Sequence, residues 1–171
     1  PLMPKEAADN TLTRARALLS YSQDYELPEG VADDLVRTAL VMGVAALDTY
    51  LHAAVLRSVR AWKPTASVAR LELRFDELCD LVEGAVEGRN DDPNSRPWVL
   101  VKDTLQERLL KMTFQSSRSV ESALSMCGIN KGWNKIATER GIGATALKRR
   151  LDQLVHRRNR IVHESDQQRS S

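Results

Sequence analysis

The apolar residues of this chain recur every three or four positions over almost its whole length. In the segment 144–163, for example, Leu147, Leu151, Leu154 and Val155 share one side of a helix drawn at about 100° per residue. Alanine and leucine supply most of the apolar positions, aromatic residues make up only 5%, and long β-branched runs are absent. This pattern favours helices over strands, so we expect an all-α fold.

Proline and glycine divide the chain into six or seven expected helices. The helices are predicted at residues 5–20, 31–61, 67–84, 97–111, 116–127, 132–140 and 144–163. The loop predicted from Gly88 to Pro97 is short for a domain linker, and apolar periodicity resumes at Trp98. We therefore predict a single domain over residues 1–171, a helical bundle with a folded core at about residues 5–163 and a polar tail at 164–171.

The composition excludes several classes of protein. With 42% hydrophobic and 28% charged residues, the chain is typical of a globular protein and not of a disordered one. Its longest apolar run, at residues 39–47, is shorter than the roughly 18 residues of a membrane span, so no membrane partner is expected. Cys79 and Cys127 stand alone without CxxC spacing, as buried thiols do in a reducing cytoplasm, where we expect this protein to reside.

The last predicted helix carries a charge within its apolar stripe. Arg158 lies one turn after Leu154 and one turn before Ile161 and Val162. A guanidinium does not lose its charge, and burying it without a partner costs roughly several kcal/mol of folding free energy. Either a partner meets this side chain, or its head group reaches solvent past the edge of the helix.

Asp48 is a candidate partner for that arginine. It lies within the apolar stripe of the long helix 31–61, among Val44, Leu51 and Val55. Two helices that each carry one charge of opposite sign on the core face suggest a contact. The sequence thus predicts an Asp48–Arg158 pair in which the carboxylate orients the guanidinium.

His163 follows Arg158 by five positions, which is about 140° around a regular helix. One straight helix does not easily bring these two side chains together, although His163 shares a face with Asn159. Three arrangements stay open: the helix loosens near its end, the arginine reaches around it, or two chains contribute to one site.

Basic residues surround this motif, although the whole chain has a net charge of only +2. They are Lys148, Arg149, Arg150, Arg157 and Arg160. Such an arc is often only a solvated face, but it also attracts phosphate groups, and a nucleic acid would then be bound through its backbone, largely without regard to sequence.

The run Leu154-Val-His-Arg-Arg-Asn-Arg-Ile-Val-His-Glu-Ser-Asp166 resembles the signature of HEPN domains, in which an arginine is followed by a polar residue, three further positions and a histidine. The segment 46–52 resembles the early helix of the HEPN subset called RiboL-PSP. A short helix with Trp133 before the last helix also fits that subset. The resemblance covers residues 31–166.

The resemblance implies a helical bundle that pairs about a two-fold axis and brings two Arg-x4-His motifs into one cleft. Many members of the family are metal-independent ribonucleases that act as toxins or in defence against phage. Carried over by position, Arg158 and His163 would be catalytic, Asn159 would support them, and Asp48 would orient Arg158. Other members only bind nucleotides or proteins.

The residue types suit cleavage of RNA, which carries its own nucleophile in the 2′-hydroxyl group. An imidazole moves protons near neutral pH, and a fixed guanidinium binds the scissile phosphate. His52, His156 and His163 lack the spacing of a metal site, so we expect neither metal nor cofactor. His52 is interpreted as a hydrogen-bonded structural residue, and His156 as a residue of the surface or the core edge.

Three functions therefore stay open. The first is an endoribonuclease, a homodimer with an antitoxin or activator as a further partner. The second is a catalytically silent HEPN module that binds a partner protein or nucleic acid. The third is an unrelated helical regulatory or scaffold domain.

Overall fold

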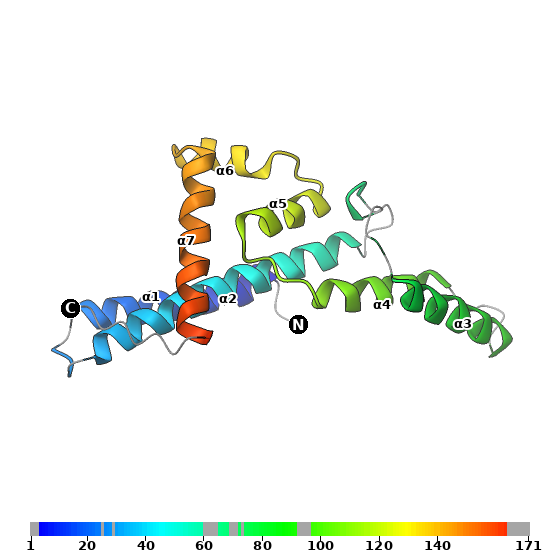
Figure 1. The fold of residues 1–171 in the computed structure, drawn as a ribbon, viewed down its shortest axis with the longest axis horizontal. Coiled ribbons are helices and arrows are strands. Elements are labelled where there is room, and N and C mark those ends of the chain that lie inside the picture. The colour runs from blue at the N-terminus through cyan, green and yellow to red at the C-terminus, as the bar shows by residue number, and fades with distance from the viewer. Residues whose placement is uncertain are drawn as a thin grey trace.

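The structure, a computed structural model, describes residues 4–24, 26–28, 30–59, 65–68, 72, 74–91 and 97–163. These residues form seven helices and no strand, which confirms the predicted all-α bundle (Figure 1). The helices are α1 (Pro4–Asp24), α2 (Val31–Val59), α3 (Phe75–Asp91), α4 (Pro97–Leu110), α5 (Ser117–Met126), α6 (Gly132–Arg140) and α7 (Ala144–His163).

The central element is α2, which contacts α1, α4, α5 and α7. Asp33 and Asp34 lie in its first turn, where carboxylates interact favourably with the helix dipole. Small side chains, among them Ala15 and Ala39, are buried where α1 lies along α2. By length and composition α2 is also the one described helix that passes the test for a membrane span, a test that core helices of soluble proteins pass as well.

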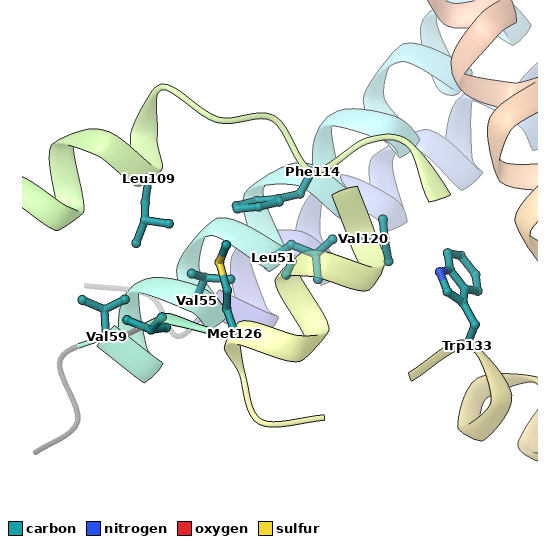
Figure 2. Close-up of a cluster of buried hydrophobic side chains, with 10 residues drawn as sticks. Leu51, Val55, Val59, Leu109, Phe114, Val120, Met126 and Trp133 are labelled. Atoms are coloured by element: carbon teal, nitrogen blue, oxygen red, sulfur yellow. The ribbon is translucent and has the colours of Figure 1, made fainter. Parts of the chain in front are cut away.

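The main hydrophobic core lies between the C-terminal half of α2 and the helices α4, α5 and α6 (Figure 2). It consists of Leu51, Val55, Val59, Val68, Leu109, Phe114, Val120, Ala123, Met126 and Trp133. Val55, Leu109 and Phe114 are completely buried. Burial of each such side chain stabilises the fold by about 1.5–3 kcal/mol, so this cluster holds four helices together.

Local sequence signals mark where the helices before α7 begin and end. Ser116 is the N-cap of α5, and its hydroxyl accepts a hydrogen bond from the backbone N–H of Ser119 at 3.1 Å. Gly141 ends α6 in the left-handed conformation, with φ of 63°. The glycine explains why the predicted boundary between α6 and α7 agrees with the structure.

The helix predicted at residues 67–84 is wrong at both ends, because α3 begins at Phe75 and continues to Asp91. Residues 65–68 form a turn instead, since Thr65 and Ser67 bond through their hydroxyls to α5 at Met126 and Ser125. The predicted loop from Gly88 is therefore helical at its start. Residues 60–61, 69–71, 73, 92–96 and the predicted tail 164–171 lie outside the described residues.

Candidate functional site

The first half of α7 is anchored to the bundle. Leu147 and Leu151 pack against the hydrophobic core. Asp152 accepts hydrogen bonds from both the backbone N–H and the hydroxyl of Ser117, at 2.8 and 2.7 Å. Lys148 forms an ion pair with Glu121 of α5 at 3.4 Å. These contacts fix the direction in which α7 crosses α2 (Figure 1).

The second half of α7 is partly open to solvent along one line of side chains. No residue of this 20-residue helix is buried, although its apolar and polar residues are segregated. Leu154 is 49% exposed and Val162 is 47% exposed. Because they lie four residues before and after Arg158, all three side chains follow one line along the helix. The apolar stripe predicted for α7 therefore has an open C-terminal half.

Arg158 is partly buried on this line. One of its terminal nitrogens, Nη1, donates a hydrogen bond to Oδ1 of Asn159 at 3.1 Å. Its Nε is buried and has no hydrogen-bond partner among the residues that the structure describes. A buried donor without an acceptor costs about 1–3 kcal/mol, so the guanidinium retains capacity to bind a further acceptor.

The predicted Asp48–Arg158 pair is wrong. The carboxylate of Asp48 accepts hydrogen bonds from the backbone N–H of Phe114 at 2.6 Å and from Nε2 of Gln115 at 3.1 Å. These residues lie in the connection from α4 to α5, and the N–H of Phe114 is outside any helix, so the carboxylate supplies its acceptor. Asp48 therefore anchors this connection to α2 and does not orient Arg158.

His52 takes part in the same anchor. Its Nδ1 lies 2.9 Å from the carbonyl oxygen of Asp48, and its Nε2 lies 2.8 Å from that of Met112. Its ring packs against the ring of Phe114, with 4.7 Å between centroids. His52 thus has the hydrogen bonds expected of a structural histidine, whereas His156 is exposed.

His163 is the last residue of α7 and is exposed. The helix stays regular up to this residue, so it does not loosen to bring the imidazole back towards Arg158. Within the described part of the chain, no hydrogen bond joins these two side chains. Of the three arrangements considered from the sequence, a long reach of the arginine and a site shared by two chains are left.

The predicted basic arc is divided in the structure. Arg149 and Arg150 are exposed, whereas Arg157 and Arg160 are partly buried. The supporting residue Asn159 is exposed beside Arg158. Phosphate groups therefore have direct access to the first half of the arc and to Asn159.

An apolar groove of about 480 Å³ lies between α1, α2 and α7. Its lining includes Leu12, Leu19, Leu40, Leu47, Leu151 and Leu154. The sequence reasoning missed this groove, because periodicity identifies the apolar face of a helix but not the space left between helices. Gly43 lines this groove, and a Cβ at its position would meet nothing within 4 Å. A glycine inside an apolar helix is therefore the one feature of the sequence that points to unfilled space here.

Within the residues that the structure describes, no three His, Cys, Asp or Glu side chains are grouped so that they could hold a metal ion. No protein-family model matches the chain, and no curated protein or solved structure is significantly similar to it. The resemblance to HEPN domains therefore depends on the motif residues and on the all-α architecture.

Proposed function

We propose that this protein is a metal-independent endoribonuclease of the HEPN type that works as a homodimer in the cytoplasm. One observation carries the proposal: within the described part of the chain the buried Nε of Arg158 has no acceptor, and the guanidinium lies between two exposed apolar residues of α7. A phosphate is a suitable acceptor for such a group, because its oxygens take charge-assisted hydrogen bonds.

The homodimer would form through the open half of α7. A two-fold axis beside Arg158 would cover Leu154 and Val162 of both copies with the same surface. It would also bring the His163 imidazole of a second copy towards the guanidinium of the first. This arrangement accounts for two motif residues that are not in contact within one chain.

The chemistry then follows from the RNA substrate. An imidazole removes the proton of the 2′-hydroxyl, whose oxygen attacks the adjacent phosphorus while the bond from phosphorus to O5′ breaks. The leaving O5′ takes up a proton from an imidazolium or from water. Arg158 stabilises the charge that develops on the phosphate oxygens. The products are a 2′,3′-cyclic phosphate and a 5′-hydroxyl, and DNA is spared because it lacks the 2′-hydroxyl.

The biological role that fits this activity is that of a toxin or phage-defence effector. A ribonuclease of low sequence specificity in the cytoplasm requires restraint, so an antitoxin or activator belongs to the proposal. A second function is a catalytically silent module that binds a partner protein or nucleic acid. The separation of His163 from Arg158 within one chain favours that alternative.

The test uses purified protein and total RNA in the presence of EDTA. We expect cleavage to persist with the chelator and to fall at least about 100-fold in His163→Ala, because general acid–base groups contribute at least that factor. The matched control is His156→Ala, which removes an exposed histidine from the same helix and should leave cleavage unchanged. Equal RNA integrity with wild type and His163→Ala would favour the silent module, and complete loss in EDTA would overturn the metal-independent mechanism.

A further inference from the structure

A second surface without cover lies on α3, far from α7. This helix packs on α4, where Glu77 pairs with Arg108 at 3.7 Å and Gly84 approaches the side chain of Leu100. The α3–α4 pair extends away from the end of α2, on the side opposite to α1 and α7 (Figure 1). The site on α7 and this surface are therefore separate.

An apolar stripe runs along α3 and is open to solvent. Phe75 is 81% exposed, Leu78 48%, Val82 57% and Val86 56%. Their spacing of three and four residues places them on one face. Singly exposed apolar residues are ordinary, but four in one line over three turns form a continuous patch of the kind that marks interaction sites.

Acidic side chains accompany this stripe. Asp80, Glu83 and Glu87 are exposed, and none forms an ion pair with another described residue. No basic residue occurs between Phe75 and Gly88. The helix therefore presents an apolar stripe beside a row of negative charge.

We propose that α3 is a docking surface for a basic amphipathic helix of a partner protein. The stripe would bury the apolar face of that helix, and the acidic row would pair with lysine or arginine residues at its edge. The stripe spans about 16 Å, which corresponds to about eleven residues of a partner helix. A lipid surface fits poorly, because anionic headgroups repel a row of carboxylates.

This inference goes beyond the ribonuclease proposal and does not depend on it. The test measures binding of a helical peptide of about 18 residues, with leucines on one face and lysines on the other, to the full chain. Two control peptides replace the lysines by glutamate or the leucines by serine. We expect binding of the first peptide, no binding of the controls, and an affinity that falls as salt is added.

The variants separate apolar from charged contributions. Val82→Glu should weaken binding at least about tenfold, because it places a carboxylate in an apolar contact. Val86→Glu, on the next turn, repeats the test if the first variant folds poorly. Replacing Asp80, Glu83 and Glu87 by lysine should also weaken binding about tenfold. The matched control is Val31→Glu, which alters an apolar residue of α2 that is 38% exposed and should leave affinity unchanged.

Three results would overturn the proposal. The first is equal affinity of Val82→Glu and wild type for the peptide. The second is binding of the glutamate peptide as well as the lysine peptide. The third is self-association of the wild-type chain without peptide that Val82→Glu abolishes, since a second copy would then be the occupant. Sedimentation of both proteins decides the third point.

Discussion

The carboxylate of Asp48 on α2 accepts a hydrogen bond of 2.6 Å from the backbone N–H of Phe114. Phe114 is fully buried and lies in the connection between α4 and α5, outside any helix. The Asp48 carboxylate thus allows the Phe114 ring to be buried, because it pairs the backbone N–H of the same residue. Without the acid, the N–H next to the ring would be buried and unpaired.

The first prediction concerns this bond. Asp48→Ala should lower the free energy of unfolding by about 1–3 kcal/mol, because the N–H of Phe114 and the amide of Gln115 both lose their acceptor. Asp48→Asn keeps one acceptor oxygen and should lose less. Urea unfolding followed by circular dichroism measures both, with Asp103→Ala on the exposed surface of α4 as the control. An unchanged midpoint for Asp48→Ala would show that this anchor is dispensable.

Two glycines should respond to alanine with opposite signs. A Cβ at Gly132 would lie 2.4 Å from Cδ1 and 3.1 Å from Cβ of Leu124, so Gly132→Ala should destabilise the protein by about 1–3 kcal/mol. A Cβ at Gly43 meets nothing within 4 Å, so Gly43→Ala in α2 should stabilise by about 0.5–1 kcal/mol. Thermal unfolding of both variants checks the pair. Equal effects would mean that α5 and α6 are not as close as described.

Self-association should depend on the open half of α7. Leu154→Glu and Val162→Glu each place a charge on a half-exposed apolar position, so we expect them to raise the dissociation constant of the homodimer about tenfold or more. Because neither residue is buried, the unfolding midpoint of the monomer should stay close to that of wild type. Analytical ultracentrifugation measures the dimer, with Val31→Glu as the control. A wild-type protein that stays monomeric at high concentration would contradict the shared site.

A shared site also predicts complementation between inactive variants. Arg158→Ala and His163→Ala should each be inactive alone, whereas mixed dimers retain one intact arginine and one intact histidine. If those two groups come from different chains, mixing should restore part of the ribonuclease activity. Absence of recovery, with mixed dimers demonstrated by mass spectrometry, would assign both groups to the same chain.

RNA affinity should depend on salt through the exposed arginines. Replacing Arg149 and Arg150 by glutamine should reduce the slope of log K against log salt concentration by about 0.7 for each phosphate group that the variant no longer binds. The decrease in affinity should be similar for RNAs of different sequence, because these arginines bind the backbone. Arg14→Gln on α1 serves as the control, since this arginine is exposed and lies outside the motif. An unchanged slope would remove these residues from the RNA surface.

Much of the fold follows from local signals. The predicted bounds of α6 and α7 agree with the structure because Gly141 has a positive φ and because apolar residues of α7 recur at helical spacing. The start of α3 could not be predicted in this way. Thr65 and Ser67 bond to the distant residues Met126 and Ser125, and that contact prevents the helix from beginning at residue 67.

The candidate site was only partly predictable for a similar reason. Helical arithmetic placed Asp48 and Arg158 on the apolar stripes of their helices, and both side chains are partly buried. It did not show which neighbour each side chain would contact. The partner of Asp48 is the backbone N–H of Phe114, and every residue type except proline has such a group, so the sequence does not reveal it. The open half of α7 was equally hidden, since an apolar stripe has the same pattern whether or not the chain itself covers it.

The two hydrogen bonds from Ser117 to Asp152 hold α7 near its middle, and the Arg-x4-His motif lies in the part of the helix that follows. Substitutions at exposed positions beyond these bonds, such as Val162 and His163, therefore remove few contacts within the bundle. Under the proposed function, such residues can be changed or lost while the bundle keeps most of its stability. If that proposal holds, an enzymatic and a silent version of this bundle would differ by a few tolerated changes at the end of a single helix.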